Sequence, residues 1–240
     1  MKVIEYFFET ISVPDFLRDV FEKDDWYLAI GRLKEYLSEH ITSQTGLYEN
    51  EKLSISGTVS IGKNCVIGAF VVIDGPVYIG DDVEIGPGTF IRPGSVIGNG
   101  CVVGHAAEVK NAVMMDGAKI SNHVFCGDSI LGVKARMGGH CESTNRRFDQ
   151  GEVEFSFKNK KLKTGLDKLG MVLGEESRLG GDVLTAPGTM IGKKTFVETG
   201  LSVSGYIPPN SYVKNDARFS IKENEFSGTL HQKSTLYEKK

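Results

Sequence analysis

The sequence lacks the features that mark several large classes of protein. Its four cysteines form no CxxC pair and are too few in 240 residues to make a disulfide framework. No apolar run approaches the roughly 20 residues that span a bilayer, and the start MKVIEYFFETISVPDF has acids and a proline where a secretory signal is apolar. The formal net charge of -3 gives no basic field to attract nucleic acid. These absences predict a soluble, cytoplasmic protein that binds neither nucleic acid nor membranes.

The sequence has instead a strict period of six residues. β-Branched aliphatic residues recur at Ile55, Ile61, Ile67, Ile73, Ile79, Ile85, Ile91, Ile97, Val103 and Val109. A second small or apolar residue follows each of them four positions later. An amphipathic helix would need a period near 3.6, and a half-exposed strand would need strict alternation. Short strands joined by sharp turns, three to a coil, fit the period, so we predict an all-β fold built as a parallel β-helix.

The period also predicts the division of the chain. Beyond Val109 two steps shorten to five residues, and the period of six returns from Leu173 onward. Residues 147–169 break the pattern, and EVEFSFKNKKLKTG within them predicts a hairpin that leaves the coil. Apolar residues at helical spacing in 24–41, after an aspartate cap, predict a helix, and VPDFLRDVFE predicts a shorter helix before it. We therefore expect a small N-terminal helical cap at 1–50, the β-helix at 51–207 and a tail at 208–240.

Cysteines and histidines are the first candidates for reactive groups. Cys65, Cys101, Cys126 and Cys141 all fall on inward positions, so we expect core residues and not nucleophiles. His105 is the second residue after its inward aliphatic, whereas His123 and His140 are the third after theirs, so only the last two should stack, about 4.8 Å apart. The sequence therefore predicts no metal site.

Charged residues mark one edge of the predicted coils. Ser56, Asp74, Arg92 and Lys110 follow inward aliphatics, each 18 residues after the last, so Arg92 and Lys110 should lie on neighbouring strands. Like charges in that arrangement repel unless an anion joins them. A solvated edge is the alternative, but the pattern favours a phosphate or other anion site.

Two segments carry a specific resemblance. IRPGSVIGNGCVVGHAAEVKNAVMMDGAKISNHVFCGDSILG and MGGHCESTN resemble the acetyltransferase half of the hexapeptide-repeat family of bifunctional N-acetylglucosamine-1-phosphate uridyltransferase/glucosamine-1-phosphate acetyltransferase, and its stand-alone sugar-phosphate nucleotidyltransferase-like relatives. The resemblance covers roughly residues 50–207. It implies a left-handed coil, a homotrimer, and acetyl transfer from acetyl-CoA to a phosphorylated amino sugar such as glucosamine 1-phosphate, in UDP-N-acetylglucosamine biosynthesis. The nucleotide loop of the uridyltransferase half has no counterpart here, so nucleotidyltransferase activity is not expected.

The resemblance also implies a role for individual residues. The residues matched to sugar-phosphate binding are Arg92, Lys110, Phe125 (a tyrosine in the family), Arg136 (an asparagine in the family) and Asn145. Acetyl-CoA lies between subunits in the family, near positions that match Gly181 and Thr199.

The residue that would act as the catalytic base is the open question. The family's histidine takes a proton from the attacking amine, and its position falls on Asn122 when counted from Lys110 without a gap. His123 comes one residue late, and neighbouring side chains of a strand or sharp corner point in different directions. An amide cannot serve as the base, so Asn122 is expected to face the site while His123 or His140 supplies the base. The alternative is a trimeric binding or scaffolding protein without catalysis, which would bind acetyl-CoA without turnover.

Overall fold

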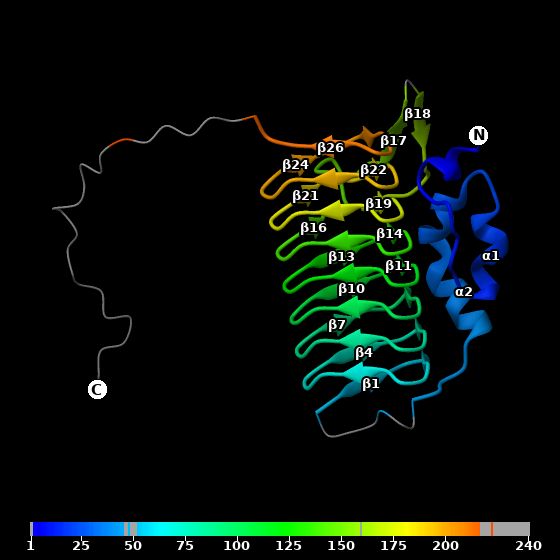
Figure 1. Cartoon of the computed structure of the whole chain (residues 1–240). Coiled ribbons are helices and arrows are strands. Elements are labelled where there is room, and N and C mark those ends of the chain that lie inside the picture. Colours follow the sequence, from blue (N-terminus) through cyan, green and yellow to red (C-terminus); the bar gives the residue numbers. More distant parts are fainter. Residues whose placement is uncertain (1, 46–47, 49–51, 159, 217–221, 223–240) are drawn as a thin grey trace.

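The computed structural model describes residues 2–45, 48, 52–158, 160–216 and 222. Their main body is a column of stacked triangular coils whose three sides are parallel sheets of eight strands each (Figure 1). Helices cover one side of the column, and an antiparallel hairpin projects near its upper end. The predicted left-handed parallel β-helix with an N-terminal helical cap is confirmed.

Each coil passes through the three sheets in a fixed order, from sheet B to sheet A to sheet C. Sheet B contains β1 (Ser54–Ser56), β4 (Val72–Asp74), β7 (Phe90–Ile91), β10 (Glu108–Lys110), β13 (Phe125–Gly127), β16 (Glu142–Ser143), β21 (Leu184–Thr185) and β24 (Ser202–Val203). Sheet A contains β2 (Val59–Ile61), β5 (Val77–Ile79), β8 (Ser95–Ile97), β11 (Val113–Met114), β14 (Ile130–Leu131), β19 (Met171–Leu173), β22 (Thr189–Ile191) and β25 (Tyr206–Ile207). Sheet C contains β3 (Val66–Ile67), β6 (Glu84–Ile85), β9 (Val102–Val103), β12 (Lys119–Ile120), β15 (Arg136–Met137), β20 (Arg178–Leu179), β23 (Phe196–Val197) and β26 (Tyr212–Val213).

The register of the strands follows the six-residue period. Ile55 pairs with Ile73 and Ile73 with Ile91, at steps of one full coil. Val109 then pairs with Cys126, one residue sooner, which is the shortening read from the sequence. The inward side chains of the three sheets form one continuous buried core along the column.

The four cysteines lie in this core, as predicted. All four are buried free thiols. Loss of hydration raises the pKa of Cys101 and of Cys126 to about 12, and burial also raises the pKa of Cys65 and Cys141. At neutral pH these thiols are protonated and are therefore poor nucleophiles.

The helical layer differs in detail from the helix expected at 24–41, whereas the shorter helix expected before it is present as α1 (Asp15–Phe21). It contains the 3₁₀ helix η1 (Val3–Tyr6), helix α1, the 3₁₀ helix η2 (Trp26–Arg32) and helix α2 (Leu33–His40). Only the second half of the expected helix is therefore α-helical. Gly31, a poor helix former, lies at the junction, and a Cβ there would come within 2.7 Å of Leu166 in the excursion. Contact with the excursion thus favours glycine at the point where the two helices join.

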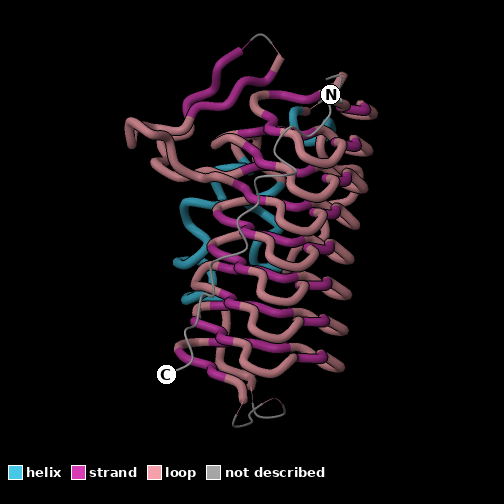
Figure 2. The backbone as a smooth tube through the Cα atoms, turned by 90° about the vertical axis from the view of Figure 1, so that its left-hand side faces the viewer, coloured by secondary structure: helices cyan, strands magenta, loops and turns pink. Residues whose placement is uncertain are grey.

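The helical layer covers the outer face of sheet A (Figures 1 and 2). The outward residues of five successive strands are fully buried beneath it: Val96, Val113, Ile130, Val172 and Met190. Trp26, Leu33 and Leu37 supply fully buried side chains from the layer. Outward positions of a sheet that faces water are ordinarily polar. The outward residues of sheet A are apolar because another part of the same chain covers them.

The excursion at about 147–169 forms the expected hairpin. Strands β17 (Glu154–Phe157) and β18 (Lys160–Lys163) pair antiparallel, and the chain re-enters sheet A at β19. Phe155 of β17 packs edge to face on Tyr27, with ring centroids 4.6 Å apart. The hairpin is thereby joined to the helical layer.

The column continues past residue 207, although the sequence analysis predicted a tail from residue 208. Strand β26 adds one more rung, because Val213 follows Ile207 by the same six residues. Most of the expected tail, residues 217–221 and 223–240, lies outside the described residues. Within the part that is described, the structure contains no helix long and apolar enough to cross a membrane.

Candidate functional site

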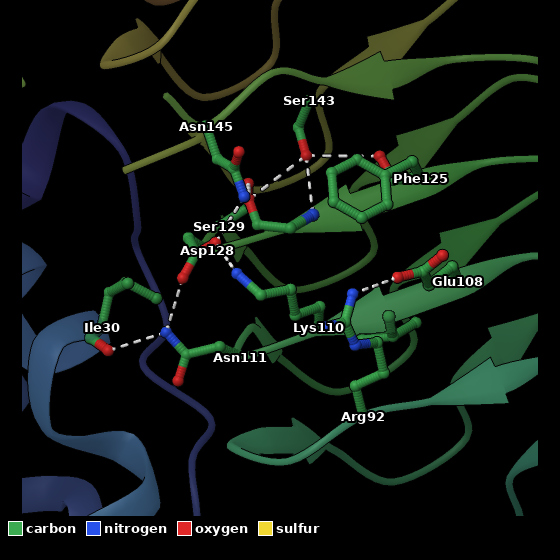
Figure 3. A network of polar contacts seen from close by, with 12 residues as sticks. Ile30, Arg92, Glu108, Lys110, Asn111, Phe125, Asp128, Ser129, Ser143 and Asn145 are labelled. Carbon is green, nitrogen blue, oxygen red and sulfur yellow. Dashed lines mark hydrogen bonds and ion pairs between the residues drawn. The ribbon is translucent and has the colours of Figure 1, made fainter. Parts of the chain in front are cut away.

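Arg92 and Lys110 occupy neighbouring rungs at the corner where sheet B turns into sheet A. Each nevertheless has a carboxylate of its own. Nη1 of Arg92 lies 2.7 Å from Oε1 of Glu108, and Nζ of Lys110 lies 2.6 Å from Oδ2 of Asp128 (Figure 3). The argument that these two cations need an external anion is therefore wrong, because the chain supplies carboxylates to both.

Asp128 is the centre of a polar network that joins three successive coils. Its side chain is only 5% exposed. Besides the ammonium of Lys110, it accepts hydrogen bonds from Nδ2 of Asn111 at 2.8 Å and Nδ2 of Asn145 at 2.5 Å (Figure 3). A buried carboxylate is costly unless it is paired and hydrogen-bonded, and three donors meet that need here. Asn111 also donates to the carbonyl oxygen of Ile30, at 2.9 Å, which ties the helical layer to this corner.

The network brings together three of the residues matched to sugar-phosphate binding: Lys110, Phe125 and Asn145. A Cβ at Gly127 would come within 2.5 Å of the Phe125 ring and 3.1 Å of Nδ2 of Asn145. The ring therefore lies across Gly127, with the amide of Asn145 beside it. An ammonium has three N–H donors, and the side chain of Lys110 remains 16% exposed. Lys110 thus has donor capacity beyond Asp128.

Glu108, Asn111 and Asp128 are site residues that the sequence reasoning missed. The spacing of residues along the coils contained the signal for two of them. Asp128 lies 18 residues after Lys110, as Lys110 does after Arg92, and Glu108 lies two residues before Lys110 on the same face of β10. The sequence gave no comparable signal for the contact between Asn111 and Ile30, because it depends on how the helical layer docks.

A second group of candidates lies at the opposite edge of sheet B, at the corner after sheet C. His123 and His140 take the left-handed conformation, with φ of 56° and 59°, and their rings stack with centroids 5.1 Å apart. The expected stacking is therefore present. His105 joins them in an edge-on contact at 5.1 Å from His123, so three exposed imidazoles form one histidine column (His105, His123 and His140).

Asn122 has a backbone partner at this corner. Its Oδ1 accepts a hydrogen bond from the N–H of His105 at 3.0 Å. The preceding corner, between sheets A and C, has the same kind of hydrogen bond: Oδ1 of Asp116 accepts from the N–H of Asn99 at 2.8 Å. The Asn122 amide thus helps to stack one coil on the next, and its expected place in a catalytic site stays a prediction.

A groove of about 510 Å³ runs along sheet C and the corner that carries His140. Gly181 and Thr199, the two residues matched to acetyl-CoA, both line it. Arg136 lines it as well, so the structure separates Arg136 from the acceptor group around Lys110. In a single chain the predicted residues form two groups, and the strand from His123 to Gly127 between them spans about 13 Å.

The three imidazoles of the histidine column are not placed to hold one metal ion together. Within residues 2–45, 48, 52–158, 160–216 and 222, the structure contains no group of three histidine, cysteine, aspartate or glutamate side chains placed to hold one.

Comparison with curated proteins gives partial matches. The chain is 38% identical over 103 residues to the "Uncharacterized acetyltransferase YaiX" of Escherichia coli O6:K15:H31, covering 43% of this chain and 45% of that protein. It is 34% identical over 95 residues to the "Bifunctional sugar-1-phosphate nucleotidylyltransferase/acetyltransferase" of Sulfurisphaera tokodaii, covering 40% of this chain and 24% of that protein. The chain thus aligns with less than half the length of either relative.

Among solved structures, the chain is similar to LpxA, a UDP-N-acetylglucosamine acyltransferase from Bacteroides fragilis 9343. The identity is 18% and the TM-score is 0.48, over 70% of this chain and 71% of that one. The family model described as the GMPPB C-terminal domain matches residues 73–218, which is more than half of the chain. The chain therefore belongs to the GMPPB C-terminal domain family, as a hexapeptide-repeat protein related to the acetyltransferase half of GlmU-type bifunctional proteins.

Proposed function

We propose that the chain is an acyltransferase that moves an acetyl group from acetyl-CoA to a phosphorylated amino sugar, with glucosamine 1-phosphate as the first acceptor to test. One observation carries the proposal. His140 directly follows Gly139, a residue of the groove that also contains Gly181 and Thr199. An exposed imidazole thus borders the groove matched to the acyl donor.

The reaction needs few groups from the protein. The amine nitrogen of the acceptor attacks the thioester carbonyl, the C–N bond forms, and the C–S bond breaks to release the thiolate of CoA. His140 takes the proton from the amine and passes it to the departing sulfur. The acceptor phosphate binds to the half-buried guanidinium of Arg92 and to the donors of Lys110 that Asp128 does not occupy.

The names of the relatives agree with this chemistry, since one is an acetyltransferase and the other acts on a sugar 1-phosphate as well. These names support the transfer of an acetyl group and a sugar phosphate as the acceptor class.

The proposal includes a homotrimer. The acceptor group and the donor groove lie at opposite edges of sheet B, and a neighbouring copy can bring a second set of these residues across the gap. Exposed apolar side chains remain on sheets B and C and at their shared corner, at Val66, Phe70 and Val72. We expect sedimentation equilibrium at micromolar concentration to give three times the chain mass of 26.2 kDa. A monomer would contradict both the trimer and a site shared between chains.

The experiment that tests the function is release of free thiol from acetyl-CoA on addition of glucosamine 1-phosphate. Replacing Arg92 with alanine is expected to weaken acceptor binding by about 1.5 to 3 kcal/mol, because a charge-assisted contact to the phosphate is lost. Titration calorimetry with glucosamine 1-phosphate measures that change. Lys63→Ala, which removes an exposed cation at a different corner, is the matched control. Equal acceptor affinity in the Arg92 variant and the wild type would show that Arg92 does not bind the phosphate.

A binding or scaffolding protein is the second candidate, and two observations favour it. The position of the family's base carries Asn122, whose amide is bonded to the backbone, and both cations of the acceptor corner already have carboxylate partners. For this candidate, acetyl-CoA or the sugar phosphate binds but no thiol is released from any mixture of the two.

A further inference from the structure

A cavity of about 630 Å³ lies on the outer face of sheet B, beside the start of the excursion. Sheet B contributes Leu184 of β21 and Ser202 of β24 to its lining, and the excursion contributes Val153. Gly181 and Thr199, the residues matched to acetyl-CoA, do not line it. Its volume is within the roughly 300 to 1,000 Å³ of small-molecule sites, so it can hold a ligand group that the two groups of site residues do not account for.

A tight turn at 147–150 forms part of this cavity. Nε and Nη2 of Arg147 lie 2.8 Å and 2.5 Å from the two carboxylate oxygens of Asp149, and the N–H of Gln150 donates to the carbonyl oxygen of Arg147 at 3.1 Å. Phe148 lies within this turn, fully exposed, and its side chain lines the cavity. The ring belongs to neither hydrophobic core, so packing within the described part of the chain does not account for it.

The two arginines of the cavity differ in how their charge is balanced. Asp149 neutralises Arg147, and that guanidinium lowers the pKa of the Asp149 carboxyl group, so both groups stay ionised at neutral pH. Arg146 donates to the amide oxygen of Gln150 at 3.1 Å and has no carboxylate partner among the residues that the structure describes. The cavity therefore offers an exposed cation next to an exposed aromatic ring.

The cavity adjoins the acceptor corner through Asn145. Thr144 and Arg146, its two neighbours in the sequence, both line the cavity. Two rungs of sheet B, or about 10 Å, separate Phe125 of that corner from Leu184. A sugar monophosphate bound at the corner does not cross this gap, whereas a sugar with a longer phosphate-linked group does.

We propose that the cavity binds the nucleoside of a nucleoside-diphosphate amino sugar, so that the acceptor of the acetyl transfer is a nucleotide-linked sugar. The base stacks on Phe148, because stacking on an aromatic side chain requires only the π face that every base has. The second phosphate binds Arg146, since a guanidinium group matches phosphate geometry. The carboxylate of Glu154, which also lines the cavity, can accept hydrogen bonds from the ribose hydroxyls. The inference rests on the proposed function, because the acceptor corner must hold the sugar and its first phosphate.

The test compares UDP-glucosamine and GDP-glucosamine with glucosamine 1-phosphate, by calorimetry on the full-length protein. One of the two nucleotide sugars is expected to bind at least about 10-fold more tightly than glucosamine 1-phosphate, because it adds a stacking contact and a phosphate contact. Phe148→Ala should weaken binding of that nucleotide sugar about 5- to 100-fold, and Arg146→Ala about 10-fold. Glucosamine 1-phosphate has no nucleoside or second phosphate, so its affinity should be the same in both variants as in the wild type.

Two further variants are the matched controls. Phe148→Tyr keeps an aromatic face, and Lys134→Ala removes an exposed cation at another corner, so both should bind the nucleotide sugar as the wild type does. Phe148 and Arg146 are exposed, so their replacement should leave the fold intact. Melting curves establish that each variant is folded.

The outcomes separate this inference from the proposed function. The nucleoside site would be overturned by nucleotide sugars that bind no more tightly than glucosamine 1-phosphate, or by an affinity that Phe148→Ala leaves unchanged, even if glucosamine 1-phosphate is acetylated. Equal losses of affinity for glucosamine 1-phosphate and for the nucleotide sugar in Arg146→Ala would overturn the assignment of Arg146 to the second phosphate. Binding of a nucleotide sugar that depends on Phe148, with no thiol release from acetyl-CoA, would support the nucleoside site while the proposed function fails.

Discussion

Replacing Asp128 with asparagine is expected to lower the free energy of unfolding by about 3 kcal/mol or more. Asparagine keeps the shape of the side chain and tolerates the positive φ of 48° at this position. It removes the negative charge that compensates the ammonium of Lys110, whose side chain is only 16% exposed. It also places an amide against the donors of Asn111 and Asn145, which an acceptor-only carboxylate satisfies. Urea unfolding followed by circular dichroism measures the change.

Two variants give this prediction its controls. Asp82→Asn changes an exposed aspartate with a similar φ of 57° and should cost less than about 0.5 kcal/mol. Lys110→Met combined with Asp128→Asn should recover much of the loss, because removal of both charges leaves neither one unpaired. If Asp128→Asn unfolds at the same urea concentration as Asp82→Asn, the network of Asp128 does not stabilise the fold as its geometry indicates.

Replacing His140 with alanine is expected to reduce acetyl transfer about 10²- to 10⁴-fold, the usual cost of losing a general base. His140 is the imidazole that adjoins the groove through Gly139. The loss should fall mainly on kcat, because the base acts in the chemical step and does not hold either substrate. Steady-state thiol release with acetyl-CoA and glucosamine 1-phosphate measures it.

The histidine column supplies the matched control for His140. His105→Ala removes another exposed ring at the same corner, but Nδ1 of His105 lies 2.8 Å from the carbonyl oxygen of Pro87, and neither of its sequence neighbours, Gly104 and Ala106, lines the groove. It should leave turnover unchanged. Asn122→Ala should lower stability by about 1 kcal/mol through loss of one hydrogen bond, with turnover retained. A large loss of turnover in His123→Ala and none in His140→Ala would show that His123, one coil away, is the base.

The sequence predicts the fold well because each coil repeats the same local rule. Ile55, Ile73 and Ile91 each face inward for the same reason, so every rung confirms the register of the last. The helical layer has no such redundancy. The residue at Gly31, near the end of η2, is constrained by Leu166, a residue far away in the sequence. No local pattern contains that information.

The candidate site divides in the same way. The stacking of His123 on His140 and of Lys110 on Arg92 could be counted from the period, because both depend only on coil length. The state of their charges could not. Whether Lys110 attracts an external anion depends on Asp128 on the next coil. The sequence argument counted only the cationic residues along the coils and left out the carboxylates that pair with them.

The helical layer over sheet A limits how copies of the chain can assemble. A triangular column has three sides, and residues of the chain itself already cover one of them along five rungs. Copies can then meet broadly only through the two remaining sides. If the B side of one copy meets the C side of the next, the contact joins unlike surfaces, so it must either close into a ring or continue as an open fibre. Because the helical layer leaves only this pair of sides for broad contact, the proposed trimer is the closed outcome of such unlike contacts, and an open fibre is the outcome when they do not close.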